Sequence, residues 1–495
     1  MRFWTTTLLL LLGANSGLKA EVRPSTMFGD GMVLQREMAV PVWGVATPGE
    51  QVTVQFAGQS KSAQADASGK WMVKLDALKT SDKGSVLTIV GNNKVTFTDV
   101  LVGEVWVCSG QSNMQMGHGG IPELKKLLTD AQKKPIRHYA VTTLVSFDPV
   151  ENCVGGWSTQ PASSAVAFGF SYHLHEKLQV PVAVIQTCWG SSSIEGWMPL
   201  DMTQKLPHFD AAMKKFETND RARVQKLLDD ATKHPRGAPR CWAGPDNIYL
   251  RTRPNILYNA MLHPIAPLAT RGLVWYQGEA NSRKPDLYAM SLPAWVARLR
   301  EQWGRDDFHF LAVMLPGYGR ISGGDNRDVE FPDNFSWAWF REAQMKVLEL
   351  PNTGVVNTID LGDAKNIHPS DKAPIGQRLA LLAARDVNRL NVVAEGPRFT
   401  DIVASGSVVT VSFENAEGLK TNDGKAPDQF WLAGEDQEWL KAAAEIKGQT
   451  VVLRAEGLKQ PVAVRYAFAG FPNVNLVNGA GLSAYPFRSD TWKRK

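Results

Sequence analysis

Short apolar runs, each followed by a turn of small or polar residues, recur between residues 101 and 394 of this 495-residue chain. Longer stretches whose apolar residues have helical spacing separate these runs. The runs cover residues 105–108, 181–188, 272–276, 310–314 and 354–359. Strands that alternate with helices in this way predict a parallel sheet with helices on its faces. The carboxyl ends of such strands meet at one edge of the sheet, where ligands bind.

Short alternating strands with turn residues between them flank this central region on both sides. They cover residues 40–44, 51–56, 70–75 and 86–90 before it, and 408–413, 451–454 and 463–468 after it. A chain of this length needs more than one hydrophobic core. We therefore predict an α/β domain at 103–394 between two sandwich-like β domains at 21–102 and 395–495. Residues 201–240 are highly charged and helical in character, which predicts an insertion into the central domain.

The first 20 residues have the pattern of a signal peptide: a basic residue, an apolar run at 8–12, and small residues before Ala20. The run is too short to span a bilayer. Export to the periplasm or the outside of the cell is therefore expected. Cleavage after Ala20 would remove Arg2 and Lys19 and lower the net charge from +5 to +3. That small excess, without a basic run, does not indicate a nucleic-acid partner.

The cysteines give no metal signal, because the chain has only four of them and contains neither a Cys-x-x-Cys pair nor a His-Glu-x-x-His motif. Cys108 and Cys188 end apolar runs and are expected to be buried thiols. Cys153 and Cys241 lie in polar stretches. An exported protein could pair them, and the sequence leaves this open.

Four blocks of small and polar residues follow strands of the central region. They are Gly-Gln-Ser-Asn-Met at 110–114 and the stretches 187–197, 275–281 and 360–369. In chain order they supply a serine, a turn of small residues, an asparagine and a histidine. A serine at the end of a buried strand can be exposed on a turn, with backbone N–H groups directed at a bound oxyanion.

Together these blocks resemble the SGNH (GDSL-like) hydrolase superfamily, and specifically its sialate O-acetylesterase family. Flanking segments at 32–36, 257–261 and 481–488 extend the resemblance over nearly the whole mature chain. The resemblance implies a catalytic α/β domain accompanied by β domains. It also implies that Ser112 is the nucleophile, Gly190 a backbone oxyanion donor, Asn281 a side-chain oxyanion donor and His368 the general base.

The chemistry of these side chains agrees with the implied roles. A serine hydroxyl is a poor nucleophile until a base takes its proton, and a neutral imidazole does this near pH 7. The tetrahedral oxyanion needs preorganised donors, and the N–H groups of Ser112 and Gly190 with the Asn281 amide would provide three.

The chain departs from the superfamily pattern at two positions. Members often carry aspartate three residues before the histidine, where this chain has Lys365. We expect Asp363 to orient His368; Asp360 is the alternative, or a backbone carbonyl that leaves a Ser-His dyad. The asparagine block, Gly-Glu-Ala-Asn at 278–281, is also one residue longer than usual.

Several motif residues also have a structural interpretation. A histidine before a proline is usually a turn residue, and Asn281 could cap a helix. Glu279 could orient a neighbour or be a solvated charge. Several tryptophans near the motifs could stack on a sugar ring or pack in the core: Trp189, Trp197 and Trp275.

The sequence thus predicts an exported carbohydrate esterase that removes O-acetyl groups, first of all from sialic acid, through an acyl-enzyme on Ser112. An acetylesterase for another polysaccharide such as xylan is the first alternative. A non-catalytic sugar-binding protein built on the two β domains is the second. No cofactor is implied, because acyl transfer to water needs none, and no membrane span or oligomeric state is indicated.

Overall fold

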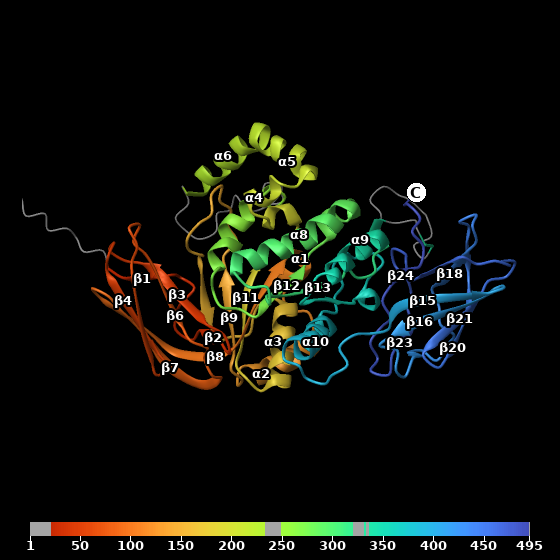
Figure 1. Cartoon of the computed structure of the whole chain (residues 1–495), viewed down its shortest axis with the longest axis horizontal. Helices are drawn as coiled ribbons and strands as arrows, with labels where there is room; N and C mark the ends of the chain where they lie inside the picture. The colour runs from red at the N-terminus through yellow and green to blue at the C-terminus, as the bar shows by residue number, and fades with distance from the viewer. Residues whose placement is uncertain (1–20, 233–248, 320–330, 333–335, 495) are drawn as a thin grey trace, which may run out of the picture.

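The computed structural model describes residues 21–232, 249–319, 331–332 and 336–494. A central sheet flanked by helices lies between two groups of antiparallel strands, one at each end of the molecule (Figure 1). This confirms the predicted fold class, an α/β region with β structure on either side. The expected signal peptide, residues 1–20, lies outside the described residues.

The N-terminal β region has two sheets. β1 (Arg23–Pro24), β3 (Val40–Val45) and β6 (Lys70–Leu75) form the first. β2 (Val33–Gln35), β4 (Gln51–Phe56), β5 (Gln59–Gln64) and β7 (Ser81–Val90) belong to the second. Strand β6 shows why this segment pairs as expected: Trp71, Val73 and Leu75 are buried and the residues between them are exposed. That alternation places one face of each strand on the core.

Strand β8 (Lys94–Gly110) connects this region to the central sheet without a break. Its first half pairs antiparallel with β7, and its second half pairs parallel with β11 (Val182–Cys188) and β12 (Gly272–Tyr276). Burial is partial in the first part of the strand and continuous in the second. The hydrophobic pattern of the sequence therefore changes in the middle of one unbroken strand. The boundary drawn at 102/103 therefore falls inside one strand.

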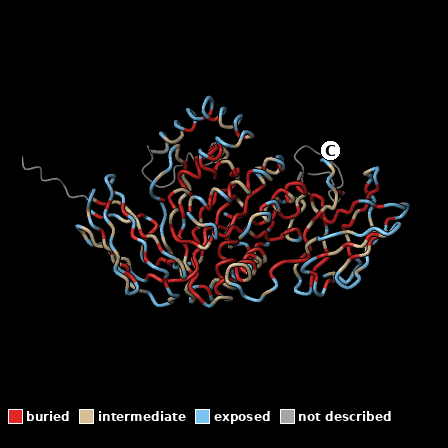
Figure 2. Tube along the Cα trace, in the orientation of Figure 1, coloured by how far each residue is buried: buried red, intermediate tan, exposed pale blue. Residues whose placement is uncertain are grey.

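The central sheet has the strand order β10-β9-β11-β8-β12-β13-β14. Its remaining strands are β9 (Ile136–Val141), β10 (Gly155–Ser158), β13 (His309–Val313) and β14 (Thr353–Val356). Every neighbouring pair is parallel except β10 with β9. All residues of β12 and β13 are buried, which is typical of a parallel sheet covered on both faces (Figure 2).

Helices cover both faces of this sheet. α3 (Ala165–Leu178) and α10 (Ala373–Leu382) pack together on one face, while α8 (Pro285–Trp303) and α9 (Ser336–Met345) pack together on the other (Figure 1). α3 and α10 approach closely because glycines meet: a Cβ on Gly376 would lie 2.6 Å from the carbonyl carbon of Gly169. The short helices α1 (Ser112–Gln115) and α2 (Pro122–Ala131) follow β8.

The pattern at 292–303 predicts a helix that begins near Pro293, with that proline in its first turn. The position of the start is wrong, because α8 begins at Pro285 and Pro293 lies inside it. Pro285 occupies the first turn, where a missing N–H costs nothing. Pro293 lacks the N–H that would bond to the preceding turn, yet the buried neighbours Leu292 and Trp295 hold this part of the helix in the core.

The charged segment after Leu200 forms a helical excursion that stands away from the sheet (Figure 1). It contains α4 (Leu200–Thr203), α5 (Asp210–Lys215) and α6 (Arg221–Thr232). Its exposed surface (Figure 2) agrees with a solvated face. The predicted insertion continues to residue 240, and residues 233–248, with Cys241, lie outside the described part.

Other helical elements are short, with three to five residues each. They are η1 (Ile194–Trp197), η2 (Pro207–Phe209), η3 (Phe216–Asp220), η5 (Tyr258–Leu262), η6 (His263–Ile265), η7 (Glu279–Asn281), η8 (Lys346–Glu349), η9 (Ile359–Leu361) and η10 (Ala383–Val387). Several of them, η7 and η9 among them, follow strands at the carboxyl edge of the sheet.

The C-terminal β region also has two main sheets. The first contains β15 (Arg398–Ser405), β16 (Val408–Glu414), β21 (Thr450–Arg454) and β20 (Ala443–Lys447). The second contains β19 (Trp439–Lys441), β18 (Phe430–Ala433), β22 (Ala463–Tyr466) and β24 (Phe487–Arg488), and a pair joins β17 (Lys420–Thr421) to β23 (Leu476–Val477). Arg341 of α9 fixes this region to the central one, because its buried guanidinium donates to the carbonyls of Ala469 and Gly470 at 2.7 Å each.

Cys108 and Cys188 are buried free thiols, as expected, and Cys153 is also buried and free. Within the described ranges no helix is long and apolar enough to cross a membrane. The same ranges contain no group of three or more His, Cys, Asp or Glu side chains arranged to hold a metal ion.

Candidate active site

Ser112 lies at the carboxyl end of β8, the middle strand of the central sheet. Gly110 ends that strand with φ +141°, and a Cβ there would lie 2.1 Å from the carbonyl oxygen of Tyr276. Only glycine permits this approach between β8 and β12. The N–H of Gln111 donates to the same carbonyl at 3.0 Å, and α1 then begins at Ser112. The serine thus sits on a strand-to-helix turn, as the sequence pattern predicts, and it is half-buried.

The two neighbours of Ser112 fasten this turn to other elements. The side-chain oxygen of Gln111 accepts a hydrogen bond from the N–H of Ala280 at 3.3 Å. The amide nitrogen of Asn113 donates to the carbonyl of Ile367 at 3.1 Å. The first contact positions the loop after β12, and the second positions the residue directly before His368.

His368 reaches Ser112 from a loop between η9 and α10. Its Nε2 lies 2.8 Å from Ser112 Oγ, although 256 residues separate them. The backbone N–H of His368 donates to Asn366 Oδ1 at 3.0 Å, which holds the loop in place. A hydroxyl that donates to a neutral imidazole at this distance is the arrangement of a nucleophile with its general base.

The surroundings of His368 favour its neutral form. Burial lowers the pKa of the imidazole, and the positive charge of Lys372 lowers it further. Lys372 itself is fully buried, and that burial lowers the pKa of its ammonium group to about 8. A general base must be unprotonated to act. Burial of His368 and the charge of Lys372 therefore extend the pH range in which His368 can act towards lower pH.

Lys372 belongs to a buried polar cluster beneath the nucleophile turn. Its Nζ lies 2.5 Å from Asn113 Oδ1, and it stands 5.6 Å from the centre of the Tyr276 ring. Asn113 in turn donates to Glu279 Oε1. Burial raises the pKa of the Glu279 carboxyl, while the Asn113 contact and the charge of Lys372 act in the opposite direction. Glu279 is therefore an internal partner of the nucleophile turn and not a solvated charge.

The acids expected to orient His368 make other contacts. Asp363 Oδ1 accepts the backbone N–H groups of Lys365 and Asn366 at 2.8 and 3.0 Å. Asp360 forms a two-pronged ion pair with Arg378 at 2.6 and 2.7 Å. Within the described part of the chain, neither carboxylate contacts the imidazole. The expectation of an Asp363–His368 contact is therefore not met, because Asp363 closes its own turn.

Gly190 lies beside Ser112, as expected from its motif. A Cβ on Gly190 would be 3.3 Å from Ser112 Cβ. Its N–H donates to Gln115 Oε1 at 2.8 Å, and its carbonyl accepts from Arg251. The N–H assigned to the oxyanion is thus directed at a side-chain oxygen from the helix that begins with Ser112.

Asn281 is the last residue of η7, after β12. Its side-chain oxygen accepts from the N–H of Ile194 at 3.0 Å and from Gln277 Nε2 at 2.7 Å, and its amide nitrogen donates to Glu195 Oε2 at 3.0 Å. An amide nitrogen has two N–H donors. One is held by Glu195, and the described residues offer the other no partner. No contact with Ser112 or His368 is made in the structure, so the oxyanion role of Asn281 stays a prediction.

Comparisons with known proteins place this geometry in a family. The model of a family described as "Carbohydrate esterase, sialic acid-specific acetylesterase" matches residues 224–385. Mouse sialate O-acetylesterase is 29% identical over 489 residues, which cover 89% of this chain and 88% of that protein. The human sialate O-acetylesterase is 28% identical over 505 residues, with 94% and 90% covered.

A solved structure also matches over almost the whole chain. The carbohydrate acetylesterase from Xanthomonas citri is 30% identical and superposes with a TM-score of 0.80, covering 95% of this chain and all of that one. The chain belongs to the sialate O-acetylesterase family. It is accordingly a carboxylic ester hydrolase that acts on acetylated sugars.

The family model covers only part of the site of this esterase. Asn281, Asp363 and His368 lie within the matched residues 224–385, and Ser112 and Gly190 precede them. The structure nevertheless brings His368 and Ser112 into contact and places Gly190 next to the serine.

The tryptophans near the motifs do not offer open faces to a sugar. Trp197 and Trp275 are fully buried and pack edge to face with ring centres 6.1 Å apart. Trp189 is 3% exposed, with the Arg251 guanidinium over its ring at 5.3 Å. The interpretation of these rings as sugar platforms is wrong. Trp275 lies within β12, Trp189 directly follows β11, and Trp197 ends η1; all three side chains are buried in the core.

The sequence analysis missed several residues of this candidate site. Lys372, Gln115 and Arg251 contact the motif residues, but none of them stands in a motif. A lysine four residues after His368 is ordinarily a surface residue. Asn113 lies inside the first block, directly after the serine. That position is the sequence signal that could have pointed to its role in the site.

Proposed function

We propose that this esterase is an exported sialate O-acetylesterase that uses Ser112 as nucleophile and His368 as general base. The observation that carries the mechanism is the 2.8 Å contact between Ser112 Oγ and His368 Nε2 at the carboxyl edge of the sheet. The same edge holds Gly190 beside the serine and the buried Asn113–Lys372 pair below it.

The reaction follows from the groups at this edge. His368 takes the proton of the Ser112 hydroxyl while Oγ attacks the acetyl carbonyl. The tetrahedral intermediate collapses, the bond to the sugar oxygen breaks, and His368 returns the proton to that oxygen. Water, deprotonated by His368, then cleaves the acetyl–serine ester, releasing acetate and restoring the hydroxyl. No aspartate partner is required, because His368 is held by its loop and by Ser112 itself.

The developing oxyanion needs donors close to Ser112. Ser112 is the first residue of α1, so its N–H has no intrahelical partner. The N–H of Gly190 is the second donor, and it becomes available when the exposed side chain of Gln115 moves away. The second N–H of the Asn281 amide is the third. Preorganised donors of this kind stabilise the transition state more than the substrate.

The names of two mammalian relatives support an acetylated sugar acid as the substrate class, and the name of a bacterial relative leaves the sugar open. The mouse and human relatives are sialate O-acetylesterases. The Xanthomonas citri relative is named a carbohydrate acetylesterase, without a stated sugar. Acetylated xylan is therefore the substrate to test beside O-acetylated sialic acid.

The test of the mechanism is the Ser112→Ala variant of the full chain. We expect it to fold normally and to lose hydrolysis of 4-methylumbelliferyl acetate. Brief reaction of the wild-type protein, followed by acid quench and mass spectrometry, should show one acetyl group on the peptide that contains Ser112. Near wild-type turnover in the folded variant would disprove the assignment.

The test of the substrate is acetate release from O-acetylated N-acetylneuraminic acid and from acetylated xylan, together with kcat/KM for acetyl and butyryl esters of one alcohol. We expect the sialic acid to be the better sugar substrate and the acetyl ester the better simple one. Activity on xylan alone would keep the mechanism and change the substrate. A preference for the longer acyl chain would contradict the proposed acetylated-sugar substrate.

Export is tested by the N-terminus of the mature protein. Val22 is 1% exposed and its N–H donates to Asn93 at 2.6 Å, so the chain is already packed against the N-terminal β region two residues after the proposed cleavage site. Sequencing of protein recovered from the periplasm or the medium should therefore begin at Glu21. Recovery of the full-length chain from the cytoplasm alone would contradict export.

A further inference from the structure

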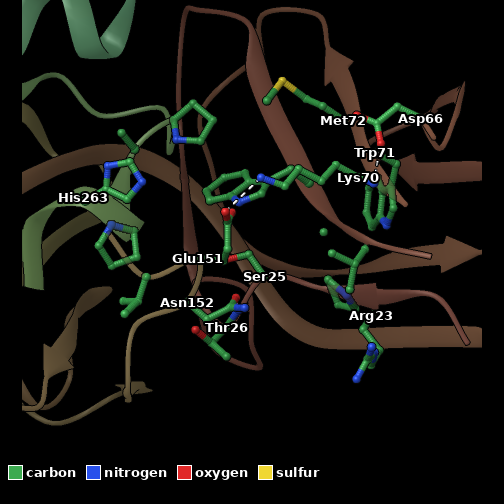
Figure 3. Close-up of a pocket in the computed structure, with 18 residues that line it drawn as sticks. Arg23, Ser25, Thr26, Asp66, Lys70, Trp71, Met72, Glu151, Asn152 and His263 are labelled. Atoms are coloured by element: carbon green, nitrogen blue, oxygen red, sulfur yellow. Dashed lines mark hydrogen bonds and ion pairs between the residues drawn. The ribbon is translucent and has the colours of Figure 1, made fainter. Parts of the chain in front are cut away.

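A cavity of about 670 Å³ lies between the N-terminal β region and the central domain. Its walls come from β1, β3 and β6 on one side and from the segments around Glu151 and His263 on the other (Figure 3). None of the residues at the proposed esterase centre lines it. A volume in this range, at a junction of two domains, is typical of a ligand site.

The floor of the cavity is fixed by hydrogen bonds across the junction. Thr26 donates through Oγ1 to the carbonyl of Cys153 at 2.7 Å, and its N–H donates to Asn152 Oδ1 at 3.2 Å. The indole of Trp157 donates to the carbonyl of Met27 at 2.8 Å. These contacts hold the two walls in one arrangement, so the cavity is formed before a ligand arrives.

Two tryptophans of the N-terminal region line this cavity. Trp43 is only half-buried, and Phe28 packs edge-on against it at 4.9 Å between ring centres. Trp71 is 3% exposed, and its indole N–H has no hydrogen-bond partner among the described residues. That nitrogen is enclosed by protein atoms, so Trp71 contributes apolar wall to the cavity and not a donor.

Polar side chains complete the lining. Lys70 and Glu151 extend from opposite walls and meet at 2.9 Å (Figure 3). Both side chains are more than half exposed, and an exposed ion pair contributes little to folding. The ammonium retains further donors and the carboxylate a further acceptor. The amide nitrogen of Asn152, whose oxygen is held by Thr26, adds donors on the same side.

The charges of the lining balance. Arg23 and Lys70 are basic, whereas Asp66 and Glu151 are acidic. Burial lowers the pKa of His263, so its ring is neutral near pH 7. A site for a phosphate or a sugar acid would have an excess of positive charge. An aromatic face beside alternating donors and acceptors instead suits the apolar face and the hydroxyls of an uncharged pyranose ring.

We propose that this cavity binds a neutral sugar unit of a glycan, with Trp43 as the stacking surface and the Lys70–Glu151 pair and Asn152 as partners for the hydroxyls. The site is separate from the esterase centre. It would hold a glycan on the protein while another part of the same or a neighbouring chain is deacetylated. The proposal does not depend on the identity of the nucleophile.

The experiment is isothermal titration calorimetry of the full chain with three neutral saccharides: lactose, xylohexaose and mannohexaose. We expect at least one to bind. Trp43→Ala should weaken that binding by about tenfold or more, as truncation of an aromatic anchor does. Glu151→Gln should weaken it less, because an amide still accepts one hydrogen bond. Neither variant should change kcat/KM for 4-methylumbelliferyl acetate.

Trp431→Ala is the matched control. Trp431 is also half-buried on a strand, and Phe331 packs edge-on against it at 5.1 Å, but it lies in the C-terminal β region. It should leave saccharide affinity unchanged. If Trp43→Ala does not fold, Trp43→Leu keeps the apolar contact with Phe28 and removes the flat ring.

Three results would overturn the proposal. The first is that none of the three saccharides binds the wild-type protein. The second is that binding is unchanged in both the folded Trp43 variant and Glu151→Gln. The third is that esterase activity on the small ester falls in parallel with saccharide affinity, since the cavity would then be part of the catalytic centre.

Discussion

Lys372 Nζ lies 2.5 Å from Asn113 Oδ1, so a buried ammonium group is joined to the residue that directly follows Ser112. Lys372 also lies four residues after His368, and its charge lowers the pKa of that imidazole. One side chain therefore supports the nucleophile turn and biases the general base towards its neutral form. Neither effect requires contact with the substrate.

Lys372→Met should move the acidic limb of the pH profile to higher pH. Activity rises as His368 loses its proton, so the limb follows the pKa of the imidazole. The wild-type pKa is lowered, and removal of the nearby positive charge raises it towards the ordinary value of 6.5. The measurement is kcat/KM for a small acetate ester from pH 5 to pH 9.

The same substitution leaves Asn113 Oδ1 without its donor, which should lower the free energy of unfolding by roughly 1–3 kcal/mol. Lys365→Met is the control, because Lys365 is on the same loop with an exposed side chain. A limb that moves equally in both variants, or stays in place in a folded Lys372→Met protein, would rule out this role.

Asp363→Asn should reduce kcat by only a few-fold. Loss of a true triad aspartate costs about 10⁴ in kcat. Asp363 instead accepts two backbone N–H groups in the turn before His368, and asparagine can accept in the same place. Steady-state kinetics on an acetate ester decide the point. A loss near 10⁴ would mean that Asp363 reaches His368 during the reaction.

Asn281→Ala should lower kcat by roughly 10²–10³-fold, the usual effect of removing one oxyanion donor. Glu195 holds one of the two amide N–H groups at 3.0 Å and so fixes the direction of the other. Glu195→Gln keeps an acceptor at the same place and should reduce kcat much less. An unchanged kcat in Asn281→Ala would restrict this residue to bonding Ile194 and Gln277.

The sequence predicts the strands of the central sheet well, because a parallel strand is a short apolar run with turns at both ends. Residues 272–276 are β12 as expected, and the run 181–188 contains β11. The meeting of Ser112 with His368 follows from the rule that the carboxyl ends of such strands share one edge. Elements that depend only on the local pattern of residues can therefore be predicted from the sequence.

The remaining features depend on contacts between distant segments. Nothing beside Lys372 in the sequence shows that it is buried against Asn113, 259 residues earlier. A tryptophan can stack on a sugar or pack in the core, and the local sequence does not distinguish the two. Trp197 and Trp275 pack in the core. Asp363 is a plausible partner for His368 by proximity in sequence, but the backbone of its own turn is nearer.

Gly190→Ala should lower kcat/KM by about tenfold or more while leaving the fold intact. The added Cβ would lie 3.2 Å from Gln115 Oε1 and 3.3 Å from both Arg251 Nη1 and Ser112 Cβ. These distances are tighter than ordinary contact, so Gln115 or the serine must shift by a few tenths of an ångström. A shift of that size beside a nucleophile disturbs the alignment on which the rate depends.

Gly119→Ala is the matched control, because a Cβ there meets nothing within 4 Å. Kinetics on an acetate ester and thermal unfolding of both variants make the comparison. Wild-type kcat/KM in Gly190→Ala would show that the acetyl carbonyl does not approach this backbone, and Gly190 would lose its place as an oxyanion donor.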